Sequence, residues 1–347
     1  MYSLDSIMKI FKYAKDLNAT DIHFAAGTVP AVRIEGQLTY MSSDKILPAD
    51  TENIINDILN TEQKSLLKAS NYLSIPVVLK EIGRLRANIF MQRGSFSINF
   101  KLLDRLLKTP EELMIPPVVM DLHKKKSGLV LVCGSSNSGK ATTMAAIIKK
   151  ISETRQCHII TVEDPIKYLC KHDKAIVNQK EIGIDVKDYI DGIHSAMIQD
   201  PDVIMVSFCG NPDMFSAVLS AAVNGHLVIT SLQTFGAVET LEYILGMYPA
   251  DRRNHIKMQL SNVLEAIVSQ RLIPSKDNKS NYLGTEVMLA GNAVKKLILE
   301  NKIHQIPALL GMSKSLGMIT FKDSVEDLYS KGLISKESVL SFLSEIS

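Results

Sequence analysis

The sequence predicts an α/β protein in which a small α+β domain precedes a nucleotide-binding domain built on a parallel sheet. Three observations lead to this fold class. From Ser127 onward strand-like segments alternate with helix-like ones, a phosphate-binding loop joins the first strand to the first helix, and the preceding part mixes short strands with helices. At 347 residues the chain is long enough for two domains, each with its own core.

The N-terminal domain is expected over residues 1–105. Apolar residues at helical spacing predict an amphipathic helix over residues 3–17, and a second helix is predicted around Thr51–Lys68. Short strands are expected at Asp21–Phe24, Ala31–Ile34 and Leu85–Phe90. The proline-rich residues 106–117 are predicted to be the linker.

The C-terminal domain is expected over residues 118–347. Its first strand, Gly128–Cys133, and first helix, Ala141–Lys149, flank the phosphate-binding loop. Further strands are predicted at His158–Val162, Val203–Ser207 and His226–Thr230. From about residue 275 the sequence is predicted to be largely helical. In such a sheet, ligands bind at the carboxyl ends of the strands.

The loop Gly134–Ala141 fits the phosphate-binding pattern G-x-x-x-x-G-K-[ST] at every position but the last. Its glycines let backbone N–H groups surround phosphates, and Lys140 would reach the β- and γ-phosphates. The last position normally ligates Mg²⁺ through a hydroxyl, and a methyl group cannot. A plain Gly/Ser-rich turn is the alternative, but a strand before and a helix after favour a phosphate site. The residues predicted to bind nucleotide are Gly134, Ser135, Ser136, Asn137, Ser138, Gly139, Lys140, Ala141 and Thr142.

Two carboxylates, Glu163 and Asp164, directly follow the second strand of this sheet. One of them could orient or deprotonate the water that attacks a γ-phosphate, although a solvated acidic turn explains the tripeptide with Pro165 equally simply. The next strand is followed by residues 207–211, which contain no acidic side chain to hold Mg²⁺. Asp202 precedes that strand, and its distance of about 20 Å along an extended chain is too great.

The composition excludes several protein classes. The formal net charge is +2 without a long basic run, which argues against a nucleic-acid-binding protein. No apolar stretch approaches a membrane span, and the first residues do not resemble a signal peptide. The four cysteines are scattered, so neither a zinc site nor a disulfide framework is expected. We therefore predict a cytoplasmic protein.

Isolated histidines and one arginine-bearing strand complete the candidate residues. His23, His158 and His255 have no metal-ligand spacing, so surface or satisfied core histidines are expected. Strand alternation places Arg84 and Arg86 on one face. Together with Arg93 they could reach the phosphates of a neighbouring copy, or they could line a solvated sheet face.

Taken together, the motifs resemble those of the type IV pilus retraction motors, the PilT/PilU branch of the secretion-type hexameric ATPases. In the N-terminal part the matching segments are Asn18–His23, Arg33–Gly36, Gly83–Asn88 and Gln92–Gly94. In the C-terminal part they are Thr161–Ile166, the aspartate-box pattern, Asp200–Asp202, Gly225–Leu232, which corresponds to the histidine box, residues 293–300 and Ser315–Met318. The resemblance covers nearly the whole chain.

The resemblance implies a PAS-like N-terminal domain, a RecA-like ATPase domain with a helical tail, and a hexameric ring that binds ATP or ADP. It also implies a pilus platform protein at the inner membrane as partner. The catalytic positions that match the family are Glu163, Asp164, His226, Arg84, Arg86 and Arg93. The four-cysteine zinc site of the pilus-assembly relatives has no counterpart here.

The departures from the family fall on catalytic positions. The family has Ser or Thr at Ala141 and Glu at Phe208, so both expected Mg²⁺-holding positions are changed. It also has Arg at Gly210, Asp at Asn211 and His at Gln233. In residues 293–300, Lys295, Lys296 and Leu299 replace the usual Arg, Asn and Arg.

Three functions remain compatible with this pattern. The first is an accessory or regulatory ring subunit that binds nucleotide with little dependence on Mg²⁺, hydrolyses ATP poorly or not at all, and depends on an intact paralogue. The second is an active retraction ATPase whose metal site has moved, for which Thr142 is the candidate ligand; a helix hydroxyl near the α-phosphate is the alternative role of Thr142. The third is a nucleotide sensor that is no longer coupled to pili.

Overall fold

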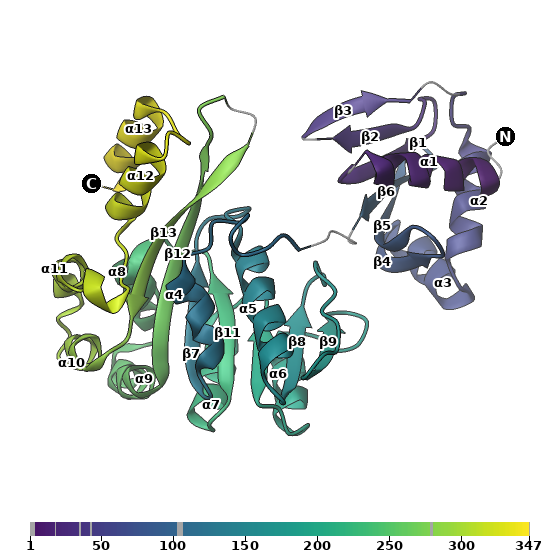
Figure 1. Cartoon of the computed structure of the whole chain (residues 1–347). Coiled ribbons are helices and arrows are strands. Elements are labelled where there is room, and N and C mark those ends of the chain that lie inside the picture. The colour runs from purple at the N-terminus through teal and green to yellow at the C-terminus, as the bar shows by residue number, and fades with distance from the viewer. Residues whose placement is uncertain are drawn as a thin grey trace. The chain divides into compact units, whose positions relative to one another are not determined.

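The structure is a computed structural model that describes residues 4–17, 19–34, 36–41, 44–102, 107–277 and 280–346. The chain forms two compact units, residues 1–106 and 107–347 (Figure 1). Asn18 and Glu35, which belong to two of the family-like motifs, and the expected linker residue 106 lie outside the described residues. No helix in the described part of the chain is both long and apolar enough to cross a bilayer.

The N-terminal unit is built on a six-stranded antiparallel sheet with the order β3-β2-β1-β6-β5-β4. Its strands are β1 (Asp21–Ala25), β2 (Ala31–Ile34), β3 (Gln37–Tyr40), β4 (Tyr72–Leu79), β5 (Gly83–Gln92) and β6 (Ser95–Leu102). Its helices are α1 (Leu4–Asp16), α2 (Pro48–Ile58) and α3 (Thr61–Ser70).

The single helix predicted around Thr51–Lys68 is in fact two helices, α2 and α3. The break has a local cause at Asn60. Its side chain accepts a hydrogen bond from Gln63 N (2.9 Å), and Gln63 Oε1 accepts one from Asn60 N (3.1 Å). This reciprocal capping box begins a new helix, and it overrides the continuous apolar periodicity.

One face of the N-terminal sheet carries the hydrophobic core. Phe11 of α1 lies edge-on to Phe100 of β6, with ring centroids 4.9 Å apart, and Phe24 of β1 completes the aromatic group. Many of the residues that alternate with the core residues along β1, β4, β5 and β6 are polar, among them His23, Ser74 and Asn99, although Val78 and Phe90 also lie on this side. The sheet therefore has one apolar face, covered by α1, and one polar face.

The C-terminal unit is built on a seven-stranded sheet with the order β13-β12-β7-β11-β10-β8-β9, in which only β13 is antiparallel to its neighbour (Figure 1). The strands are β7 (Gly128–Cys133), β8 (His158–Glu163), β9 (Ile176–Glu181), β10 (Val203–Val206), β11 (Leu227–Leu232), β12 (Leu264–Pro274) and β13 (Asn281–Leu289). The α-helices are α4 (Pro117–Met120), α5 (Lys140–Thr154), α6 (Tyr189–Met197), α7 (Pro212–Val223), α8 (Gly236–Gly246), α9 (Ala250–Val263), α10 (Asn292–Leu299), α11 (Ile306–Met312), α12 (Phe321–Ser330) and α13 (Lys336–Ile346).

Helices bury both faces of this sheet. Leu129 and Leu131 of β7 pack into one cluster with residues of α6 to α11, whereas Val130 and Val132 pack into another with residues of α4 and α5. Burial on both faces explains why β7 is an unbroken apolar run and not an alternating one. The strand–helix alternation predicted from Ser127 onward is confirmed.

The helical tail begins later than predicted. Residues 275–289 are not helical: β12 and β13 form a long antiparallel pair that continues to Leu289, and α10 starts at Asn292. Ser269 and Gln270 interrupt the apolar pattern of β12, yet both are fully buried and hydrogen bonded. Tertiary pairing with β12 thus makes residues 281–289 a strand, and β12 itself pairs with β7.

Residues 107–117, predicted as linker, pack within the C-terminal unit. Ile115 is buried in the core beside α5, and Leu113 is partly buried there. The turn before it is closed by Thr109 N donating to Glu112 Oε2 (2.8 Å). The prolines of this segment therefore shape a packed strap and not a free linker.

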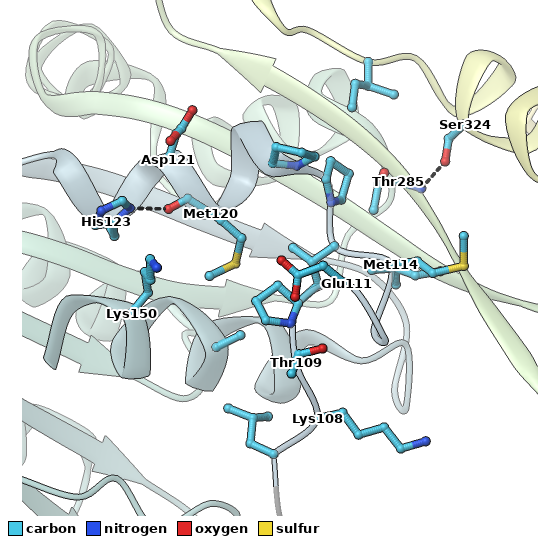
Figure 2. Close-up of a pocket in the computed structure, with 18 of the residues that line it drawn as sticks. Lys108, Thr109, Glu111, Met114, Met120, Asp121, His123, Lys150, Thr285 and Ser324 are labelled. Carbon is cyan, nitrogen blue, oxygen red and sulfur yellow. Dashed lines mark hydrogen bonds between the residues drawn. The ribbon is translucent and has the colours of Figure 1, made fainter. Parts of the chain in front are cut away.

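A cavity of about 860 Å³ lies between this strap, α5, β13 and α12. Figure 2 shows Met114 and Met120 of its apolar lining, Lys150 of α5, and Thr285, whose backbone N–H donates to Ser324 Oγ of α12 (3.0 Å). None of its lining residues belongs to the loop 134–141.

We expect Phe11→Ala to destabilise the N-terminal unit by about 3–5 kcal/mol, because it removes a fully buried ring from the aromatic group. Hydrogen exchange should show faster exchange in β1 and β6, with β7 and β8 unchanged. Tyr13→Ala, at a position of α1 that is 50% exposed, is the control and should change stability by less than about 0.5 kcal/mol. Equal loss of protection in both units would contradict the division of the core.

Candidate nucleotide site

The loop between β7 and α5 has the backbone geometry of a phosphate cradle. Gly134 has φ 143°, and a Cβ atom there would lie 2.4 Å from the carbonyl oxygen of Gln270. Gly139 has φ 92° and precedes the first residue of α5. The close contact at Gly134 and the positive φ angles at Gly134 and Gly139 both require glycine. The backbone of the resulting loop leads directly into the N-terminus of α5.

Lys140 lies folded over this loop. Its Nζ donates to the carbonyl oxygens of Gly134 (2.8 Å) and Ser135 (2.7 Å). Burial lowers the pKa of the Lys140 ammonium from its usual value. The ammonium is thus held at the mouth of the loop, where phosphate oxygens would be better acceptors than neutral carbonyls.

The hydroxyl group of Thr142 is hydrogen bonded to a neighbouring side chain. Thr142 Oγ1 and the hydroxyl of Tyr168 lie 2.9 Å apart in a hydrogen bond. Tyr168 belongs to the segment after β8, whose backbone is fastened by Gln179 Nε2 donating to Tyr168 O (3.0 Å). The bond to Tyr168 gives Thr142 a structural role that the sequence did not reveal.

Glu163 lies at the carboxyl end of β8, with 6% of its surface exposed. Its Oε1 accepts hydrogen bonds from Thr161 Oγ1 (2.7 Å) and Gln179 Nε2 (3.0 Å). Burial raises the pKa of the carboxyl group above its usual value. Asp164 is exposed, and its N–H donates to Ser207 Oγ (3.3 Å). The acidic pair therefore splits into one buried and one solvated carboxylate.

Phe208 and Gly210 form a coupled pair after β10. A Cβ atom at Gly210 would lie 2.4 Å from both Cε1 and Cζ of the Phe208 ring. The ring itself is half-buried and packs against the core on that side of the sheet. The phenyl ring thus occupies the space through which a side chain at position 210 would pass, so the two substitutions belong to one packing arrangement.

Hydroxyl groups fill the neighbouring strand ends. Tyr189 OH and Ser207 Oγ lie 2.9 Å apart, and Ser231 Oγ donates to Ser207 O (2.7 Å). Burial raises the pKa of Tyr189 to about 12, so its hydroxyl stays protonated. Neither Tyr189 nor Ser231 stands out in the sequence, because Tyr189 begins α6 and Ser231 lies in β11, and only the tertiary structure brings both to Ser207.

His226, predicted as a catalytic candidate, lies away from the phosphate loop of its own copy. It precedes β11, and its Nδ1–H donates to Pro201 O (2.7 Å). Parallel pairing places Leu227 opposite Gly128 and Leu232 opposite Cys133. His226 is therefore at the amino edge of the sheet, opposite to the edge of its own phosphate loop, and Gln233 takes the position after β11.

The three arginines belong to the N-terminal unit. Arg84 and Arg86 alternate along β5 on its polar face, as predicted, and Arg93 lies exposed in the turn between β5 and β6 with φ 47°. In the described ranges, 4–17 through 280–346, no group of three or more His, Cys, Asp or Glu side chains could hold a metal ion.

Comparison with known proteins agrees with this geometry. The family model described as "Type II/IV secretion system protein" matches residues 91–306. The type IV pilus ATPase PilU of Pseudomonas aeruginosa is 30% identical over 96% of this chain and 87% of its own length, and PilT of that organism, named a type IV pilus retraction ATPase, is 30% identical over 96% of both. This chain belongs to the type IV pilus retraction ATPase family.

A crystal structure of the pilus retraction motor PilT with bound ADP has a TM-score of 0.90 to this chain, with 35% sequence identity and 96% of each chain covered. The RecA-like fold of the C-terminal unit predicted from the resemblance is thereby confirmed.

The phosphate loop fits the nucleotide that this family implies, since its glycines and Lys140 have the required geometry. The two positions expected to hold Mg²⁺ do not fit the ion. Ala141 offers a methyl group and Phe208 a phenyl ring, neither of which ligates a metal.

We predict that Gly210→Ala destabilises the protein by about 1–2 kcal/mol, because the new Cβ displaces the Phe208 ring. In a Phe208→Ala background the same substitution should cost nearly nothing. Denaturant unfolding of the four proteins measures both costs. Gly291→Ala, whose Cβ meets no atom within 4 Å, is the matched control. An equal cost of Gly210→Ala in both backgrounds would show that the two positions are independent.

The raised pKa of Glu163 predicts a pH dependence of stability. Burial disfavours the charged Glu163 carboxylate in the folded state, so the folded protein retains the proton more strongly than the unfolded chain does. The resulting contribution of Glu163 to the free energy of unfolding is fully present at low pH and is lost as pH rises through the folded-state pKa. Glu163→Gln should therefore gain stability relative to the natural protein as pH rises from the ordinary carboxyl pKa of 4.5 toward neutrality. Thermal unfolding across this range measures the difference, and parallel pH curves would contradict the assignment.

Proposed function

We propose that this protein is a nucleotide-binding ring subunit of a type IV pilus retraction machine that hydrolyses ATP poorly or not at all. The observation that carries this proposal is the Phe208 ring, which stands where the family has the metal-holding Glu and covers Gly210, where the family has Arg. Ala141 changes the second metal-holding position.

Nucleotide binding is supported by the intact part of the loop. Backbone amides, the N-terminal end of α5 and the Lys140 ammonium all attract phosphates without the help of a metal. ATP or ADP is the ligand we expect, bound more weakly than in relatives and with little dependence on Mg²⁺. The ADP in the PilT structure is consistent with this assignment.

We expect little hydrolysis because of the size of the rate loss that such replacements cause. Removing one group that stabilises developing charge in a transition state typically lowers a rate by about 10²–10³. Both groups expected to hold the bridging ion are replaced here. The alternative is a relocated metal site at Thr142. The hydrogen bond between the hydroxyl groups of Thr142 and Tyr168 argues against this alternative, because a metal would have to compete with Tyr168 for the Thr142 oxygen.

The remaining features support an accessory role in a ring. Arg84, Arg86 and Arg93 are candidates to contact the nucleotide of a neighbouring copy, which requires an oligomer, and the family resemblance makes it a hexamer. We expect the ring to act on the cytoplasmic side of the inner membrane, with the pilus platform protein as partner. Turnover would then come from an intact paralogue that this subunit joins or regulates.

The proposal predicts measurable nucleotide binding without turnover. A fluorescent ATP analogue should bind the natural protein and lose at least tenfold affinity in Lys140→Ala, whereas phosphate release with Mg²⁺ should be indistinguishable between the two. The assay is repeated with an intact relative such as P. aeruginosa PilT, whose turnover should change in the mixture. Robust Mg²⁺-dependent turnover that Lys140→Ala abolishes would refute the proposal.

Restoring the metal-holding groups tests the same idea from the other side. Ala141→Ser combined with Phe208→Glu should raise hydrolysis by more than the product of the two single effects, because both groups hold one ion. Adding Gly210→Arg should raise it further only when Phe208 has been replaced, since the ring blocks that position. A gain from Ala141→Ser alone that equals the gain of the double variant would count against a shared ion.

A further inference from the structure

A row of half-buried polar side chains crosses the polar face of the N-terminal sheet. Ser74, Asn88, Asn99 and His23 are directly opposed on β4, β5, β6 and β1, as the strand register shows. We call these four residues the polar row. They alternate with the core residues of the same strands, so they lie on the face that α1 does not cover.

Hydrogen bonds join the polar row to Arg86 at one end and to Asp21 at the other. Arg86 Nε donates to Ser74 Oγ (2.7 Å), Ser74 Oγ to Asn88 Oδ1 (2.6 Å), Asn88 Nδ2 to Asn99 Oδ1 (3.2 Å), and Asn99 Nδ2 to His23 Nδ1 (3.2 Å) and Asp21 Oδ1 (3.4 Å). In each of these hydrogen bonds the donor therefore lies on the side of Arg86 and the acceptor on the side of Asp21.

The direction of these bonds follows from the groups at the two ends. A guanidinium can only donate hydrogen bonds and a carboxylate can only accept them, so each amide between them must accept on the side of Arg86 and donate on the side of Asp21. Burial lowers the pKa of His23, which favours the neutral ring, and a neutral ring has one nitrogen that can accept a hydrogen bond from Asn99 Nδ2. Hydrogen bonds aligned in this way polarise and strengthen one another.

The position of Arg86 needs stabilisation by the polar row because another cation lies opposite it on the neighbouring strand. Its direct cross-strand partner on β6 is Lys101, and like charges in that arrangement repel each other. The bond from Nε to Ser74 draws the guanidinium toward β4, away from Lys101, and fixes the plane of the group.

We propose that the polar row positions Arg86, with Ser74, Asn88 and Asn99 as positioning residues that hold its guanidinium in the orientation needed to bind phosphate oxygens of a nucleotide on a neighbouring copy of this chain. The inference rests on the proposed function, in which Arg86 acts on such a nucleotide. It adds a requirement that Arg86 alone does not meet, since a mobile arginine loses affinity through the entropy of ordering.

The test uses the full chain and the affinity for a fluorescent ATP analogue, measured above and below the concentration at which light scattering shows assembly. Asn88→Leu interrupts the row at its centre and leaves Arg86 in place. We expect it to weaken binding about fivefold in the assembled protein, the change that corresponds to one lost hydrogen bond, and to leave binding unchanged in the monomer. Arg86→Ala should weaken binding at least as much, and the double variant no more than Arg86→Ala alone.

Three further variants separate positioning from general stability. Ser74→Ala removes only the hydroxyl that Arg86 contacts and should weaken binding even if Asn88→Leu fails to fold, whereas Ser74→Thr keeps a hydroxyl and should bind like the natural protein. Ser95→Ala is the matched control, because the Ser95 hydroxyl donates to Gln92 O in the turn and lies outside the row. It should leave binding unchanged.

The outcomes distinguish this inference from the proposed function. If Arg86→Ala weakens binding but Ser74→Ala and Asn88→Leu do not, or if their effects add to that of Arg86→Ala, the positioning role is wrong and the proposed function stands. If Arg86→Ala has no effect in the assembled protein, or no assembly forms, both the positioning role and the shared site are wrong. Nucleotide binding lost in Lys140→Ala supports the proposed function independently.

Discussion

The pairing of β7 with β11 and β12 is the constraint on which the nucleotide site depends. It brings Gly134 so close to the carbonyl of Gln270 that only glycine fits, and it fixes the start of α5 at the loop. Thr143 of α5 accepts a hydrogen bond from Gln270 Nε2 (2.7 Å), which joins the helix to β12 from within the core. The phosphate cradle is therefore built by buried contacts that do not involve the altered catalytic positions.

That separation explains how the site could lose one function and keep another. In the proposed function, nucleotide binding depends on the loop backbone, the N-terminus of α5 and Lys140, all positioned by β7 and β12. Metal-dependent chemistry depends on side chains after β10 and at position 141, and there the polar groups expected from the family have become Phe208, Gly210 and Ala141. Because the phenyl ring fills the space above Gly210, the altered edge is a packed structure with its own stability.

In the N-terminal unit, by contrast, polar side chains are present and joined to one another. Its polar face is not simply solvated, since Arg86, Ser74, Asn88 and Asn99 are joined by directed hydrogen bonds across neighbouring strands. Such a row suits the proposed requirement that the Arg86 guanidinium keep one orientation. Under the proposed function, the changed residues at positions 141 and 208 and an ordered Arg86 would suit a protein in which nucleotide stabilises an assembly.

The sequence by itself determined the phosphate loop, the strand–helix alternation and the shared face of Arg84 and Arg86, because these follow from local pattern and the period of two along a strand. It did not separate α2 from α3, since the capping box at Asn60 competes with apolar periodicity. Only the tertiary structure decided that His226 lies at the far edge of the sheet, that Gln270 is a buried strand residue, and that Phe208 covers Gly210. Each of these depends on strand order and on side-chain packing between segments distant in the chain, which no local pattern encodes.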